Sequence, residues 1–190
     1  MKKLIIILFL SFGEIATAQD LNDLYFLKLV NAHRAKNGLA LVKYDLTLDS
    51  ACKLQADYQL RVDRCTHTQD PTNGTDTLFW YIAGNRLDRV DANWTRRFHR
   101  YPIGENCAKW KYAGPVFQPE MRVDTTMVKR IFEMWIHSPG HNAVLLMPGA
   151  TVAAIELSFL RTQNYNTILD LASYDFRLFA TCLLMIELKK

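Results

Sequence analysis

The sequence contains no apolar run long enough to cross a membrane as a helix. The longest candidate, residues 4–13, is about half of the roughly 20 residues that a span requires. Two lysines precede this run and the triplet ATA follows it, which has the small-x-small form that a signal peptidase cuts. We therefore expect a signal peptide over residues 1–18, one exported domain over residues 19–190, and no membrane span.

The sequence also lacks a large excess of charge of one sign. The chain has 23 Lys and Arg against 19 Asp and Glu, and removing the charged residues of the expected signal peptide leaves 21 bases against 18 acids, a net charge near +3. The most basic stretch, TRRFHRY at residues 95–101, mixes aromatic side chains with arginines, a pattern that can also grip a phosphate backbone. We interpret it as a solvated loop face and expect no nucleic-acid partner.

Cysteines are few: Cys52, Cys65, Cys107 and Cys182. An even number in an exported chain predicts two disulfides rather than a catalytic thiol, and four cysteines allow three pairings. A helix over residues 48–63 would hold Cys52 and Cys65 farther apart than the roughly 7 Å between Cα atoms that a bridge tolerates. That pairing is disfavoured, and the other pairings stay open.

Internal repeats and low-complexity tracts are absent, and apolar residues recur at three- and four-residue steps in three segments. The first segment, residues 21–38, ends on Gly38, which suits a left-handed helix stop. The second covers residues 48–63 and leaves His67 in the loop that follows it. The third begins after Asp124, a suitable N-cap, and stops before the proline of the SPG triplet. These segments predict three helices.

Two later segments have a different pattern. Residues 151–160 and 176–188 are rich in apolar and β-branched side chains, which predicts two buried antiparallel strands, and residues 104–110 are a third candidate. Residues 68–103 have no sustained period and contain turn signals, so we expect mostly loop there, with one short helix at residues 78–82. Helices early and strands late favour an α+β layered domain.

Two histidines in WIHSPGHNAVLLMP stand four residues apart, the spacing of a zinc-binding helix. Pro139 and Gly140 lie between them, and the residue before a proline is pushed out of helical geometry. His137 therefore ends one helix and faces solvent, whereas His141 belongs to the next turn. The pair does not form a metal motif, and His141 requires partners from elsewhere in the chain.

Four segments, LVNAHRAKNGL, THTQDP, GENCA and MWIHSPGHNAVLLMP, follow one another along the chain. In order and spacing they resemble the secreted CAP superfamily, which comprises cysteine-rich secretory proteins, antigen 5, pathogenesis-related 1 proteins and bacterial members, and is also called the SCP domain. The bacterial-type branch is the most similar. The likeness is loosest over residues 68–103 and after residue 150. It implies a three-layer α-β-α sandwich in which helices flank a small antiparallel sheet.

The resemblance also implies a cleft lined by two histidines and usually two glutamates. Carried over by position, these are His67, His141 and Glu105. The place of the second glutamate is taken by Ser138 or its neighbours, so this chain departs from the full set, and Glu133 lies elsewhere on the helix.

Two neutral imidazoles and a carboxylate can hold zinc with one coordination position open. His67 and His141 are therefore candidate metal ligands, with zinc as the candidate cofactor. A zinc-dependent hydrolase is one alternative, but no oxyanion donor, substrate-gripping arginine or GxSxG elbow is evident, and we assign no catalytic residue. A purely structural hydrogen bond between His67 and Glu105 is another.

These observations lead to the expectation of a secreted, monomeric protein acting outside the cytoplasm, extracellular or periplasmic. The resemblance implies that its partner is a lipid, a peptide, a glycan or a surface protein, bound at the cleft. The alternative is an interaction protein acting through the loops of residues 68–103. The sequons at Asn73 and Asn93 matter only if the host glycosylates exported proteins.

Overall fold

The structure is a computed structural model that describes residues 21–69, 83–115, 124–166 and 171–188 of the 190-residue chain. The expected signal peptide, the short helix expected at residues 78–82 and the sequon at Asn73 lie outside these ranges.

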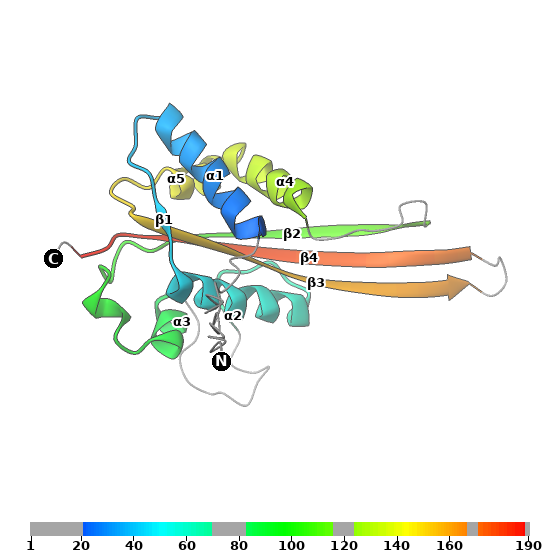
Figure 1. The fold of residues 1–190 in the computed structure, drawn as a ribbon. Coiled ribbons are helices and arrows are strands. Elements are labelled where there is room, and N and C mark those ends of the chain that lie inside the picture. The colour runs from blue at the N-terminus through cyan, green and yellow to red at the C-terminus, as the bar shows by residue number, and fades with distance from the viewer. Residues whose placement is uncertain (1–20, 70–82, 116–123, 167–170, 189–190) are drawn as a thin grey trace, which may run out of the picture.

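A four-stranded sheet with the order β1-β3-β4-β2 forms the middle of the fold (Figure 1). The strands are β1 (Lys43–Tyr44), β2 (Gly104–Pro115), β3 (Val152–Asn166) and β4 (Leu171–Met185). β4 pairs antiparallel with both β2 and β3, as expected, but β1 pairs parallel with β3. The sheet is therefore mixed rather than wholly antiparallel. β1 escaped prediction because two residues are too few to show an alternating pattern.

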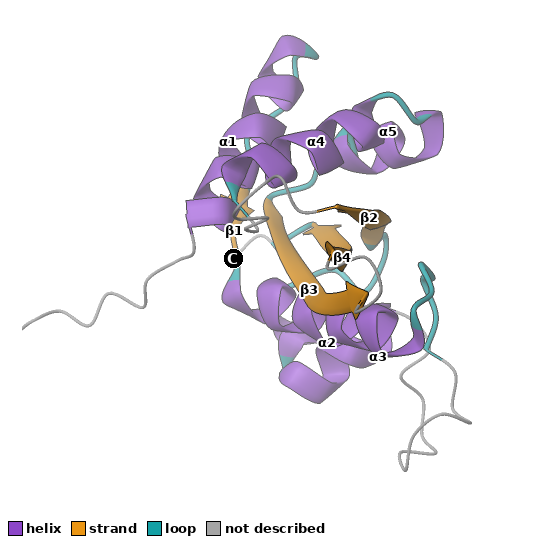
Figure 2. Ribbon diagram, turned by 90° about the vertical axis from the view of Figure 1, so that its right-hand side faces the viewer, coloured by secondary structure: helices purple, strands orange, loops and turns teal. Residues whose placement is uncertain are grey.

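Helices cover both faces of this sheet (Figures 1 and 2). α1 (Leu21–Lys36), α4 (Thr125–Ile136) and α5 (Pro139–Leu145) lie on one face. α2 (Leu46–Val62) and α3 (Ala83–Val90) lie on the other. The predicted α-β-α sandwich is confirmed.

Strand alternation divides the interior into two apolar clusters. On β3, Ala153 and Ile155 pack with the helices α1 and α4, whereas Val152 and Ala154 pack with α2. Successive side chains of a strand point to opposite faces, so one apolar strand supplies both clusters. In the first cluster Trp135 lies edge to face with Phe26, with ring centroids 6.0 Å apart.

Local capping decides where the helices begin and end. Asp45 starts α2 by accepting hydrogen bonds from the backbone N–H groups of Thr47 and Leu48, at 2.9 and 3.1 Å. Asp63 ends α2 in the left-handed region, with φ 51°. His67 therefore lies in the loop after the helix, as the sequence predicts.

Residues 83–96 were expected to be loop, and that expectation is wrong. They contain α3 and a 3-10 helix, η2 (Trp94–Arg96). Leu87 and Trp94 are buried, and Trp94 Nε1 donates to Asp88 Oδ1 at 2.6 Å. Helices this short bury too few side chains to produce a sustained apolar period. Phe98, from the stretch interpreted as a solvated face, is also buried.

The expectation of two disulfides is wrong as well, because all four cysteines are free. Cys52 belongs to the apolar cluster beneath α2, and Cys182 belongs to the cluster on the opposite face of the sheet. The Cys107 thiol donates to the carbonyl oxygen of Thr66 at 3.4 Å and does not bond to the neighbouring Cys65.

Candidate functional site

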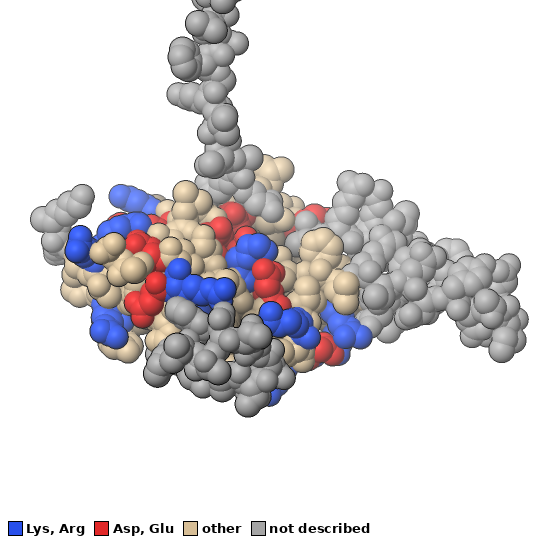
Figure 3. Space-filling model, turned by 90° about the horizontal axis from the view of Figure 1, so that it is seen from below, with Lys and Arg blue, Asp and Glu red and all other residues tan. Residues whose placement is uncertain are grey.

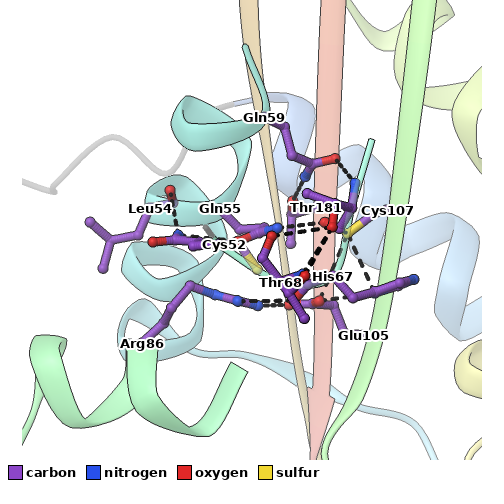
Figure 4. Close-up of polar contacts among 12 residues, drawn as sticks. Cys52, Leu54, Gln55, Gln59, His67, Thr68, Arg86, Glu105, Cys107 and Thr181 are labelled. Carbon is purple, nitrogen blue, oxygen red and sulfur yellow. Dashed lines mark hydrogen bonds and ion pairs between the residues drawn. The ribbon is translucent and has the colours of Figure 1, made fainter. Parts of the chain in front are cut away.

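His67 and Glu105 meet at the end of the sheet where β2 begins. Nδ1 of His67 donates to Oε1 of Glu105 at 3.0 Å, although the residues are 38 positions apart (Figure 4). The His67 side chain is 56% exposed and the Glu105 side chain is 8% exposed. The carboxylate thus forms the floor of the site and the imidazole reaches out toward solvent.

Arg86 of α3 lies behind this pair. Its guanidinium contacts the second carboxylate oxygen of Glu105, Oε2, and its Nη1 donates to the carbonyl oxygen of His67 at 3.4 Å. Burial lowers the pKa of Arg86 to about 10, so the guanidinium stays charged at neutral pH. Arg86 therefore holds both His67 and Glu105. Nothing in the sequence distinguishes it from the other arginines of its segment.

Cys107 lies two residues after Glu105, on the same side of β2, and belongs to the same group. Its Sγ lies 3.6 Å from Nδ1 of His67 and 3.8 Å from Oε1 of Glu105. Burial raises the pKa of the Cys107 thiol to about 12. The ligand atoms of these three residues all lie within 4.8 Å of one another, a spacing that could hold a metal ion. Cys107 was expected in a disulfide, and the sequence did not reveal this arrangement.

His141 approaches from α5. Its Nδ1 is 2.9 Å from Oγ of Ser138, and its carbonyl oxygen accepts a hydrogen bond from Asn106 Nδ2 of β2 at 3.0 Å. Burial and the charge of His67 lower the pKa of His141, so the two imidazoles are electrostatic neighbours. His141 does not belong to the compact group formed by His67, Glu105 and Cys107. His137, at the end of α4, is exposed as expected.

Arg34 of α1 fixes the position of α5, which carries His141. Its side chain is fully buried and donates to four backbone carbonyl oxygens, at 2.8, 2.9, 3.1 and 3.3 Å: those of Ala40, Leu145, Met147 and Ala150. The preceding residue, His33, contacts Asn142 Oδ1 through Nε2 at 2.7 Å. These contacts join the HR pair of the first motif to the last motif. No role for Arg34 was predicted from the sequence.

A pocket of about 430 Å³ opens beside this group. His67 and Glu105 line it together with residues of α3, β2, α5 and the segment before β2: Gly84, Tyr101, Ile103, Gly104 and Val144. A Cβ on Gly104 would come within 2.9 Å of Cγ1 of Val144, so glycine allows α5 to lie close to the edge strand. The pocket is thus bounded by helices from both faces of the sheet.

Charged side chains elsewhere on the α2 face are mixed in sign (Figure 3). Lys109 and Lys111 both pair with Asp63, at 3.0 and 2.6 Å, and Arg97 pairs with Asp45. On this face Asp63 is therefore the shared counter-ion of both lysines. The described residues include no helix that is both long enough and apolar enough to span a bilayer.

Comparison with known proteins places the chain in a family. The family model for the cysteine-rich secretory protein family, CAP, matches residues 27–182. No curated protein matches the chain. An extracellular protein containing an SCP domain from Bacillus anthracis str. Ames is similar in structure, with 18% identity, a TM-score of 0.50, and coverage of 82% of this chain and 39% of that one.

An outer surface protein from Borrelia burgdorferi also matches, with 15% identity, a TM-score of 0.45, and coverage of 85% of this chain and 90% of that one. The present chain spans 39% of the length of the Bacillus protein. These structural likenesses concern the fold. Because the family model covers most of the described sandwich, from α1 to β4, this chain belongs to the CAP family of cysteine-rich secretory proteins.

Proposed function

We propose that this domain is a secreted, non-catalytic binding module that takes up a divalent transition-metal ion, zinc in the first instance, at the imidazole of His67. The observation that carries the proposal is the approach of His67 Nδ1 to Glu105 Oε1, at 3.0 Å, on the wall of an open pocket. Imidazole nitrogen and carboxylate oxygen are ligands that zinc takes in proteins. Glu105 and His141 are the residues that would complete the site.

The protonation state of the histidines supports this proposal. Burial and the charge of Arg86 lower the pKa of His67, while burial and the charge of His67 lower that of His141. Both rings are therefore neutral at physiological pH, and the neutral imidazole is the form that binds a metal ion.

The surroundings of Glu105 favour binding over hydrolysis. A zinc hydrolase requires a carboxylate or another base that can take a proton from the metal-bound water. Here Oε2 of Glu105 is engaged by Arg86 and Oε1 faces His67. Among the described residues of the group, no carboxylate oxygen remains for that task, so we assign the cleft to binding without turnover.

The pocket beside the ion suggests what the module binds. Its volume of about 430 Å³ falls within the range of small-ligand sites. The wall combines apolar side chains such as Ile103 and Val144 with the polar group of His67 and Glu105. In this proposal the monomeric domain binds part of an extracellular lipid, peptide, glycan or surface protein there, with the ion as an anchor.

Zinc titration by calorimetry, together with elemental analysis, tests the proposal. We expect uptake of one zinc per chain by the wild type and a loss of more than about tenfold in affinity for His67→Ala combined with His141→Ala. The matched control is His99→Ala combined with His137→Ala, which removes two exposed histidines. Equal uptake by both double variants would refute the metal site.

A second assay separates binding from catalysis. The purified protein is incubated with ester and peptide substrates, with chelator and after zinc is restored. The binding module predicts no turnover in any condition. Hydrolysis that chelator abolishes and zinc restores would replace the proposal with the hydrolase alternative.

A further inference from the structure

We infer that Cys107 is a ligand of the same ion, so that the site presents nitrogen, oxygen and sulfur together: Nδ1 of His67, Oε1 of Glu105 and Sγ of Cys107. This inference rests on the proposed metal uptake at His67 and names the third atom that holds the ion. It also assigns a role to a thiol that neither the disulfide expectation nor the histidine pair explains.

The three atoms have the spacing of one face of a zinc tetrahedron. Zinc binds nitrogen and oxygen at about 2.0–2.2 Å and sulfur at about 2.3 Å, which puts tetrahedral ligand atoms roughly 3.3–3.6 Å apart. The observed separations are 3.0 Å for nitrogen and oxygen, 3.6 Å for nitrogen and sulfur, and 3.8 Å for oxygen and sulfur. Ligation by Nδ1 requires the ring proton, which Nδ1 donates to Glu105 in this structure, to reside on Nε2 instead, and ligation by Sγ releases the thiol proton to solvent.

The backbone holds these side chains in place before any ion arrives. Glu105 and Cys107 are two residues apart on β2 and therefore point to the same side of the strand. The loop that carries His67 is held against α2 at Thr66. The N–H of Thr66 donates to Gln59 Oε1 at 3.3 Å, and its carbonyl oxygen accepts from Gln55 Nε2 at 2.5 Å. A site on such supports needs little reorganisation to bind.

Trp135 of α4 fixes the same strand from the other side. Its Nε1 donates to the carbonyl oxygen of Cys107 at 3.3 Å. The Cys107 side chain, in turn, donates to the carbonyl oxygen of Thr66 at 3.4 Å. Cys107 is thus held through both its main chain and its thiol, with Sγ directed at the His67 loop.

Charge balance also favours a thiolate ligand. Arg86 is a buried cation in contact with Glu105, and a divalent ion held by His67 and Glu105 alone would add two positive charges beside it. A thiolate ligand removes one of them, and at low dielectric the repulsion between close charges is strong. Metal coordination deprotonates a thiol outright, so the ligand is available despite its burial.

The other three cysteines do not share this position. Cys52 and Cys182 are fully buried in the apolar clusters, and Cys65 is exposed outside the compact ligand group. Thiolate ligation gives the site a chemical preference, because soft sulfur selects zinc, cobalt and cadmium over magnesium and calcium.

Cobalt(II) titration followed by absorption spectroscopy tests the inference, with a phosphine as reductant because a thiol reductant would itself bind the metal. We expect the near-ultraviolet charge-transfer band of a cobalt–thiolate bond in the wild type. The band should persist in Cys65→Ser, the matched control, and disappear in Cys107→Ser. Cadmium affinity should fall more than about tenfold in Cys107→Ser.

The outcomes separate this inference from the function on which it rests. Cobalt uptake without the band, dependent on His67 and His141, overturns the role of Cys107 and leaves the metal-binding module intact. A band that survives in Cys107→Ser and is lost in Cys65→Ser also overturns it. Absence of any uptake defeats both proposals. If Cys107→Ser does not fold, Cys107→Ala replaces it, and a wild-type spectrum without the band is decisive by itself.

Discussion

Arg86 pairs with Glu105 inside the protein, where the arginine side chain has no exposed surface and the glutamate side chain is 8% exposed. The two residues come from α3 and β2. A buried carboxylate would be costly without a counter-ion. Arg86 contacts Oε2 of Glu105 and so keeps the carboxylate charged. The other oxygen, Oε1, is directed at His67.

Replacement of Arg86 by methionine should destabilise the fold strongly. It leaves the Glu105 carboxylate buried without its partner, which costs about 3–5 kcal/mol when one member of a buried pair is removed. Urea unfolding measures the loss. Arg89→Met, on the exposed side of the same helix, should cost less than about 1 kcal/mol. If the two variants are equally stable, the pair does not have this structural role. Adding Glu105→Gln to Arg86→Met should recover part of the loss.

Arg34→Met should weaken both stability and zinc uptake. The change removes the guanidinium donors of four carbonyl oxygens, of which that of Met147 also accepts from the N–H of Ala150. A buried polar group left unsatisfied costs about 1–3 kcal/mol. We expect a loss of at least about 3 kcal/mol in unfolding free energy. Because α5 depends on these bonds, the ion site near His141 should loosen. Arg34→Lys keeps the charge but loses the planar set of N–H donors, so its unfolding free energy should lie between those of the wild type and Arg34→Met. A lysine variant as stable as the wild type would contradict the explanation.

Gly104→Ala should force α5 away from β2. The new Cβ would approach Cγ1 of Val144 to 2.9 Å, and overpacking of this kind costs about 1–3 kcal/mol. Thermal unfolding measures the change. Val144→Ala removes the Cγ1 atom that the new Cβ would contact. The double variant should therefore be more stable than the sum of the two single changes predicts. Strict additivity would mean that the two sites do not interact.

The contribution of His67 and His141 to stability should fall when the pH is lowered through the ordinary histidine range. The pKa of His67 and that of His141 are lowered from 6.5 in the folded chain, chiefly by burial, so the unfolded chain takes up protons first. The two histidines therefore contribute stability that is present above pH 6.5 and is lost below it. Glu156 contributes in the opposite direction, because burial raises the pKa of its carboxyl to about 7. Zinc affinity should fall as the pH is lowered, since protons compete for the ring nitrogens.

His67→Asn tests the origin of this pH dependence. The slope of unfolding free energy against pH, measured between pH 7.5 and pH 5, should be less positive in His67→Asn than in the wild type. A slope that is unchanged in His67→Asn assigns the pH dependence to other groups.

Much of the helical structure could be predicted because its signals are local. Asp45 and Asp124 cap α2 and α4 with their own side chains, and Gly38, with φ 70°, follows α1. The pattern of LSFL and FRLF likewise located β3 and β4, although both strands extend to 15 residues. The polar segments of those strands pair with one another through the backbone, which no side-chain pattern reports.

The candidate site was only partly visible in the sequence. The end of α2 predicts that His67 lies in a loop, and the break at Pro139 separates His137 from His141. The role of Cys107 was missed because its two-residue spacing from Glu105 has meaning only when β2 is known to face the His67 loop. Arg86 and Arg34 were missed for a related reason: burial of a guanidinium depends on what packs around it.

The sequence by itself determined the elements whose causes lie within a few residues, such as caps, turns and apolar periods, and its motifs indicated the family. Only the tertiary structure decided which polar atoms meet. His67 and Glu105 are 38 positions apart, and their contact follows from the docking of α2 and α3 on the face of β2 that Glu105 and Cys107 share. Hydrogen bonds and ion pairs act over a few ångströms of space, whereas sequence patterns report only order along the chain.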